Sequence, residues 1–192
     1  MKKISILGST GSIGRNTVEV ISGHQDKFKV VGLAANNSVQ LLQAQILALK
    51  PDVVAVFDEA AAEALKKKNL PVEIVSGQEG LVRIATLEQA DMVVSAIVGS
   101  AGLLPTHEAI KAGKDVALAT KEALVMAGGI IMSEAAKRGV RLLPVDSEHS
   151  AVFQCLQGRD IKEVRQVILT ASGGPFINRD VSQRAAVTPE EA

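Results

Sequence analysis

The 192-residue sequence lacks tryptophan and tyrosine, has a single cysteine and carries no net charge. One cysteine, Cys155, excludes an internal disulfide and any metal site built from several cysteines. Only four phenylalanines are available to stack on nucleic-acid bases. The 21 basic and 21 acidic residues balance, so no overall field attracts nucleic acid or an anionic membrane. These absences argue against nucleic acid as a partner.

Long hydrophobic runs are also missing. Stretches such as MVVSAIVG (92–99) are far shorter than the roughly 20 apolar residues that span a bilayer. The amino end turns glycine-rich before a signal-peptide core could form. We therefore expect a cytoplasmic protein with no membrane partner.

Short apolar runs alternate with segments of helical periodicity along most of the chain. Runs that are apolar on both sides and separated by helices indicate parallel strands buried beneath helices. The pattern predicts an α/β fold with a doubly wound, mostly parallel, Rossmann-like sheet. Strands are expected over residues 4–7, 29–35, 53–56, 72–75, 91–97, 115–119 and 140–145, and helices over 13–21, 39–49, 59–68, 106–112 and 122–137.

The pattern changes beyond residue 150. SAVFQCLQG (150–158) predicts a helix ended by Gly158, and VRQVILTASGGPF (164–176) predicts a strand entering a glycine turn. The remaining residues have no apolar face of their own. We expect residues 1–150 to form a nucleotide-binding domain and residues 151–192 to begin a second, truncated α/β domain.

The segment ISILGSTGSIGRNTVEVI (4–21) combines a strand, a glycine turn and an amphipathic helix. Gly8, Gly11 and Gly14 have the spacing G-x-x-G-x-x-G, a variant of the dinucleotide fingerprint. Such glycines allow the backbone to approach a pyrophosphate, whose charge meets the positive end of the helix. A tight turn without a ligand is the alternative, but the position at the first strand favours nucleotide binding.

The end of the second strand indicates which nucleotide is bound. NAD enzymes usually place an acid there to hold the ribose hydroxyls, yet no Asp or Glu lies between Asp26 and Asp52. Asn36, Asn37 and Ser38 could instead donate hydrogen bonds to a 2′-phosphate, which favours NADP over NAD. Asn and Ser are also ordinary turn residues, so that alternative stays open.

Polar residues follow two later strands, where ligands sit in open α/β sheets. Lys121 could face a phosphate or a polarised carbonyl. In PVDSEHS (144–150), Asp146 and Glu148 are two positions apart, so in extended backbone they would point the same way and could hold Mg²⁺. Alternatively, Asp146 or Ser147 caps a helix beginning near His149. Cys155 is expected in the core rather than as a nucleophile.

Five motifs occur in order along the chain: GSTGSIG, AIVGSAGLLPT, ALATKEALV, PVDSEHSA and TASGGPF. In these motifs the chain resembles the amino-terminal part of the 1-deoxy-D-xylulose-5-phosphate reductoisomerase family. The resemblance implies an enzyme that isomerises this sugar phosphate and reduces the product with NADPH and Mg²⁺ or Mn²⁺, giving 2-C-methyl-D-erythritol 4-phosphate for isoprenoid synthesis. It also implies a homodimer for the full-length enzyme.

The resemblance assigns roles to individual residues. It implies metal binding by Asp146 and Glu148, substrate binding by Lys121, Ser147, Glu148 and Ser172, and catalytic roles for Lys121 and Glu148. NADPH contacts are expected from Gly8, Thr10, Gly11, Ser12, Ile13, Gly14, Asn36, Asn37, Ser38, Thr120 and Glu122.

Two positions depart from the family pattern. Thr120 stands where Asn is common, and Asn36 to Ser38 replace Gly-Lys-Asn, which removes a positive charge from the NADP site. Because the family's lid and third acidic metal ligand lie downstream, the chain alone is expected to bind NADPH without turnover. A semialdehyde dehydrogenase and a non-catalytic dinucleotide-binding module are the alternative interpretations.

Overall fold

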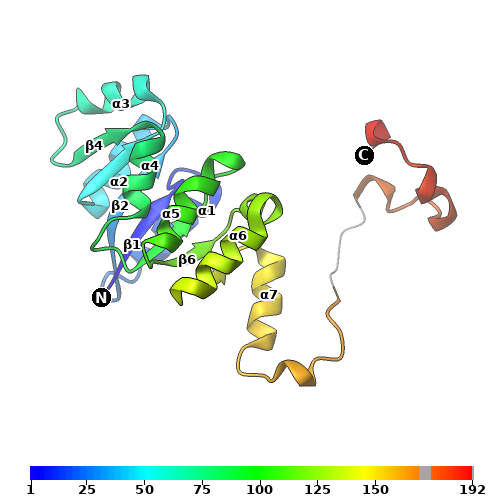
Figure 1. Ribbon diagram of the computed structural model, residues 1–192. Helices are drawn as coiled ribbons and strands as arrows, with labels where there is room; N and C mark the ends of the chain where they lie inside the picture. Colours follow the sequence, from blue (N-terminus) through cyan, green and yellow to red (C-terminus); the bar gives the residue numbers. More distant parts are fainter. Residues whose placement is uncertain (169–173, 192) are drawn as a thin grey trace. The chain divides into compact units, whose positions relative to one another are not determined.

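The computed structural model describes residues 1–168 and 174–191, which divide into two compact units, Met1–Ser150 and Ala151–Ala192. The first unit contains a seven-stranded sheet in which each strand pairs in parallel with its neighbours (Figure 1). Its strands are β1 (Lys2–Leu7), β2 (Phe28–Ala35), β3 (Val53–Val56), β4 (Glu73–Ser76), β5 (Met92–Ser95), β6 (Asp115–Leu118) and β7 (Leu142–Pro144).

The strand order is β4-β3-β2-β1-β5-β6-β7. From β1 the chain adds β2, β3 and β4 on one side of the sheet. It then crosses back to place β5 on the other side of β1, followed by β6 and β7. In open α/β sheets, ligands bind beyond the carboxyl ends of the strands where the order reverses. Here that position lies between β1 and β5.

Helices cover both faces of the sheet because the strands are apolar on both sides. In β3, Val54 and Val56 pack with residues from α1, α2 and α3, whereas Val53 and Ala55 pack with residues from α4, α5 and α6. Figure 1 shows α4, α5 and α6 together on one face. The helices are α1 (Ser12–Ser22), α2 (Val39–Leu49), α3 (Glu59–Lys66), α4 (Gly77–Ala85), α5 (Leu103–Lys111), α6 (Glu122–Arg138) and α7 (Ser147–Leu156).

Beyond α7, the described residues contain only short 3-10 helices: η2 (Ile161–Glu163), η3 (Gly174–Phe176), η4 (Val181–Ala186) and η5 (Pro189–Glu191); η1 (Ser100–Gly102) precedes α5. The strand predicted over 164–176 is wrong for residues 164–168, which form no regular element. Residues 169–173 lie outside the described part of the chain. None of the described helices combines the length and apolarity needed to cross a bilayer.

Candidate functional site

The turn between β1 and α1 lies at the point where the strand order reverses. Gly8 has a φ of +84°, and a Cβ added there would lie 2.5 Å from the Ala96 carbonyl oxygen. The N–H groups of Gly8 and Ser9 both donate to the Ala34 carbonyl, at 2.9 and 2.8 Å. Because Ala34 belongs to β2 and Ala96 follows β5, the turn is held between the strands that flank β1.

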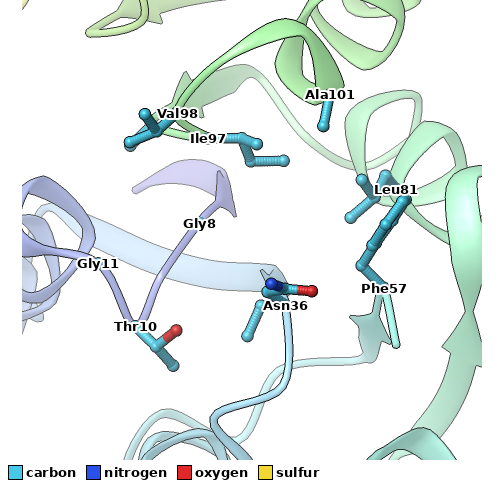
Figure 2. A pocket seen from close by; sticks show the side chains of 11 residues that line it. Gly8, Thr10, Gly11, Asn36, Phe57, Leu81, Ile97, Val98 and Ala101 are labelled. Carbon is cyan, nitrogen blue, oxygen red and sulfur yellow. The ribbon is translucent and has the colours of Figure 1, made fainter. Parts of the chain in front are cut away.

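A cavity of about 320 Å³ opens at this turn, and we name it the glycine-turn cavity. Figure 2 shows the turn on one side of it, with Phe57 and Leu81 on the other side and the Asn36 side chain between them. Helix α1 has no acidic residue in its first turn, so nothing there repels an anion. The lining residues are Gly8, Thr10, Gly11, Ala35, Asn36, Phe57, Leu81, Ala96, Ile97, Val98 and Ala101.

A second cavity, of about 370 Å³, lies at the ends of β6 and β7. We name it the Lys121 cavity. It shares Ala96 and Val98 with the glycine-turn cavity, so the two hollows adjoin beyond the end of β5. Its lining residues are Ile13, Ala96, Val98, Ala119, Thr120, Lys121, Glu122, Val145, Asp146 and Ser147.

Asp146 is the electrostatic centre of the Lys121 cavity. Its carboxylate lies 3.0 Å from the Lys121 Nζ and 2.7 Å from the His149 Nδ1. The hydrogen bond with His149, followed by that with Lys121, holds the pKa of the Asp146 carboxyl well below its usual range. The same pairing raises the pKa of the Lys121 ammonium. Both groups are therefore charged at neutral pH.

Thr120 connects the loops that follow β5 and β6. Its side chain is buried, and its hydroxyl donates to the Ile97 carbonyl oxygen at 2.7 Å. A hydroxyl has one hydrogen to donate, so Thr120 uses its donor within the protein. The residue lines the Lys121 cavity while fixing the segment that lines the glycine-turn cavity.

The structure brings most of the predicted site residues to these two adjoining cavities. Ile13, Thr120, Lys121, Glu122, Asp146 and Ser147 line the Lys121 cavity, and Gly8, Thr10, Gly11 and Asn36 line the other. Ser12, Gly14, Asn37, Ser38 and Glu148 line neither of them, and Ser172 lies outside the described residues.

Two structural expectations about residues of α7 are wrong. Helix α7 begins at Ser147, so Glu148 is helical and the extended-backbone argument is wrong, although a side-chain interaction with Glu148 still helps to lower the pKa of the Asp146 carboxyl. The Glu148 carboxylate also accepts a hydrogen bond from the Ser147 hydroxyl at 2.9 Å. Cys155 is exposed rather than in the core, and it lines neither the glycine-turn cavity nor the Lys121 cavity.

Phe57 and Leu81 were not predicted as site residues. Phe57 directly follows β3 and is 40% exposed, which is unusual for a large apolar side chain. In the sequence, the usable signal for Phe57 was its position, because a large apolar residue directly after a buried strand lies at the end of the sheet where ligands bind. Leu81 is buried on α4 and has no such signal, because its sequence context is that of any core leucine.

Solved structures that resemble this one include a reductoisomerase from Zymomonas mobilis in complex with NADPH. The TM-score is 0.88 at 40% identity, covering 98% of this chain and 50% of that one. A second, a DOX-P reductoisomerase in complex with NADPH, fosmidomycin and magnesium, has a TM-score of 0.85 at 36% identity, covering 100% and 50%.

Sequence relatives give the same result. The chain is 52% identical over 192 residues to 1-deoxy-D-xylulose 5-phosphate reductoisomerase of Thermodesulfovibrio yellowstonii, and 53% identical over 194 residues to that of Geotalea uraniireducens. It spans about half the length of these relatives, since it covers 50% of each.

Two family models match along the chain. Residues 142–192 match the C-terminal domain of 1-deoxy-D-xylulose 5-phosphate reductoisomerase. Residues 4–128, which include the glycine turn, match the model for 1-deoxy-D-xylulose 5-phosphate reductoisomerase itself. The sequence resemblance is thus confirmed, and the chain belongs to the 1-deoxy-D-xylulose 5-phosphate reductoisomerase family.

Proposed function

We propose that this chain binds NADPH in the glycine-turn cavity and contributes to the conversion of 1-deoxy-D-xylulose 5-phosphate into 2-C-methyl-D-erythritol 4-phosphate. The observation that carries the proposal is the position of the cavity. It opens at the reversal of strand order, beside a glycine turn and the amino end of α1. That arrangement suits a dinucleotide pyrophosphate.

The cavity walls fit the remaining parts of NADPH. Phe57 and Leu81 offer an apolar wall to the adenine ring. Asn36 follows β2, where its amide can donate to a ribose 2′-phosphate, and no carboxylate in that tip repels it. The nicotinamide end would then extend toward Ala96 and Val98, where the Lys121 cavity begins.

The Lys121 cavity fits a small sugar phosphate together with a divalent cation. Among residues 1–168 and 174–191, no three His, Cys, Asp or Glu side chains gather in a group that could hold a metal ion. Mg²⁺ is nevertheless often held by one or two carboxylates plus substrate oxygens. Asp146 and Glu148 stay our proposed protein ligands, and the charged state of Asp146 supports its role.

The chemistry divides between bound groups and side chains. When bound, the metal supplies polarisation of the ketone and hydroxyl oxygens, and NADPH supplies the hydride. Lys121 is placed to bind substrate oxygens at the end of β6, and Ser147 borders the same space. The catalytic roles of Lys121 and Glu148, the contact of Ser172 with substrate, the homodimer and the cytoplasmic location stay predictions.

Coenzyme selectivity provides the test. Titration of the 192-residue chain with NADPH and NADH, followed by coenzyme fluorescence, is expected to show tighter binding of NADPH by about tenfold or more. Asn36→Asp should remove most of that preference because its carboxylate would repel the 2′-phosphate. Asn69→Asp, which adds the same charge on the exposed turn before β4, should change neither affinity.

Two results would contradict the proposal in different ways. Equal affinities of the unsubstituted chain for NADPH and NADH would reject recognition of the 2′-phosphate at Asn36. Failure to bind either coenzyme would mean that the glycine turn has only an architectural role.

A further inference from the structure

Two polar side chains, Ser9 and Gln45, are buried next to the glycine turn. Ser9 is fully buried directly after Gly8, and Gln45 is only 5% exposed. Gln45 lies on α2, whose other buried residues are Leu42 and Ile46. A buried side-chain amide without hydrogen-bond partners would lower the free energy of unfolding by about 1–3 kcal/mol. Gln45 is tolerated in these surroundings because its amide is hydrogen-bonded.

Gln45 and Ser9 form two hydrogen bonds with each other. The Ser9 hydroxyl donates to the Gln45 Oε1 at 2.7 Å, and the Gln45 Nε2 donates to the Ser9 carbonyl oxygen at 2.8 Å. Only the NH₂ end of an amide can donate to a carbonyl oxygen, so the orientation of the Gln45 amide is fixed. The Ser9 N–H is also engaged, since it donates to Ala34.

These bonds act on the segment that borders the cavity. Gly8, Thr10 and Gly11 line the glycine-turn cavity, whereas Ser9 and Gln45 do not. A Cβ added at Gly14 would lie 2.6 Å from the Ser9 Cα, so α1 packs directly on Ser9. Ser9 is therefore held by both α1 and α2, and the backbone on either side of it is held as well.

We infer that Gln45 is a positioning residue for the phosphate-binding turn. The inference rests on the proposed function, because it concerns the binding of the NADPH pyrophosphate by the turn. Gln45 fixes Ser9, and Ser9 fixes the neighbouring backbone of Gly8, Thr10 and Gly11, which borders the cavity at the amino end of α1. Helix α2 also begins directly after Asn36, Asn37 and Ser38, so one helix connects the expected 2′-phosphate site with the pyrophosphate site.

The first test replaces the amide by an apolar side chain of similar size, Gln45→Leu, in the 192-residue chain. We expect the NADPH dissociation constant to rise about tenfold, because the Ser9 carbonyl loses its side-chain donor. Binding of adenosine 2′-monophosphate, which has no pyrophosphate, should stay within about twofold of the unsubstituted chain by calorimetry. Gln43→Leu, half-buried on the same helix, is the matched control and should leave both constants unchanged.

The second test, Gln45→Glu, has a readout that a purely structural role would not change. A carboxyl group can accept from the Ser9 hydroxyl at any pH, but it donates to the Ser9 carbonyl only when protonated. The ratio of the variant's NADPH dissociation constant to that of the unsubstituted chain should be large near pH 8 and fall toward one as the new carboxyl is protonated. This comparison remains informative if the leucine variant does not fold.

The outcomes separate the inference from the proposed function. Unchanged NADPH affinity in both Gln45 variants, with native circular dichroism, would overturn the inference. Equal weakening of NADPH and adenosine 2′-monophosphate would also overturn it, because general loosening would then explain the loss. If the unsubstituted chain does not bind NADPH, the proposed function itself is wrong.

Discussion

Asp115 links the amino ends of β6, β7 and β1, at the end of the strands opposite the cavities. Its carboxylate accepts hydrogen bonds from the Arg141 backbone N–H at 3.0 Å and from the Arg141 Nε at 3.1 Å, and Lys2 lies 3.7 Å away. The side-chain hydrogen bond from Arg141 is the largest cause that lowers the pKa of the Asp115 carboxyl below its ordinary 3.8. Asp115 is 19% exposed, so water screens these contacts only in part.

We expect Asp115→Asn to lower the free energy of unfolding at pH 7 by about 1 kcal/mol. Because the pKa is lower in the folded chain than in the unfolded chain, this stabilisation is complete above the unfolded value. It is lost as the pH falls through the folded value. Urea unfolding at pH 7 and at pH 3 should show a difference between variant and unsubstituted chain that narrows in acid.

The control for this prediction is Asp26→Asn, at an exposed position before β2. It should have little effect on stability at either pH. The same difference in unfolding free energy for Asp115→Asn at pH 7 and at pH 3 would show that the ion pairs with Arg141 and Lys2 do not stabilise the fold.

At the residue scale, the sequence predicted those parts of the site whose geometry depends on one local motif. The spacing of Gly8, Gly11 and Gly14 was sufficient to place the turn. Gln45 could not be found, since it contacts Ser9, 36 residues away, only after α2 packs on the sheet. The pairing of Lys121 with Asp146, 25 residues apart, likewise depends on β6 and β7 being neighbours.

At the scale of single elements, the contact between α1 and the glycine turn is the tightest feature of the site. A Cβ at Gly14 would collide with the Gly8 carbonyl oxygen and with the Ser9 backbone. Backbone atoms cannot move aside as a flexible side chain can. Helix α1 can approach the turn after β1 this closely only because residue 14 has no side chain.

Gly14→Ala is therefore expected to lower the free energy of unfolding by about 3 kcal/mol, because the added methyl group overpacks the contact. Gly129→Ala is the matched control. It lies inside α6, where an added Cβ meets no atom within 4 Å, so it should stabilise the chain by about 0.5 kcal/mol. Chemical denaturation measures both, and equal effects would contradict the close packing of α1.

In the first unit, the elements predicted from the apolar pattern agree with the structure to within a few residues at their ends, but helix α4 was not predicted; beyond the first unit, the predicted strand fails. Alternating strands and helices have strong signals in the first unit, and α2 begins and ends where predicted. The failure at residues 164–168 has a physical reason. An apolar run predicts a strand only if a neighbouring strand pairs with it, and the described residues supply none for this run.

At the scale of the whole molecule, the two compact units differ in how much they bury. The first unit has a continuous apolar core on each face of its sheet. In the second unit, no side chain among residues 151–168 and 174–191 is buried. Burial of apolar surface is the main stabilising contribution to folding. The described residues of the second unit therefore contribute little to the free energy of unfolding.

Limited trypsin digestion should therefore begin at basic residues of the second unit, such as Arg159, Lys162 and Arg165. Local opening costs little free energy where few side chains are buried. Mass spectrometry should show a persistent product that retains the first unit. Early cleavage at exposed lysines of the first unit, such as Lys67 and Lys68, would contradict this order.

The wall formed by Ala96 and Val98 belongs to both cavities. Under the proposed function, a coenzyme in the glycine-turn cavity and a substrate in the Lys121 cavity would meet at this border. A substitution that changes the shape of this border is then expected to change the affinities for both proposed ligands together.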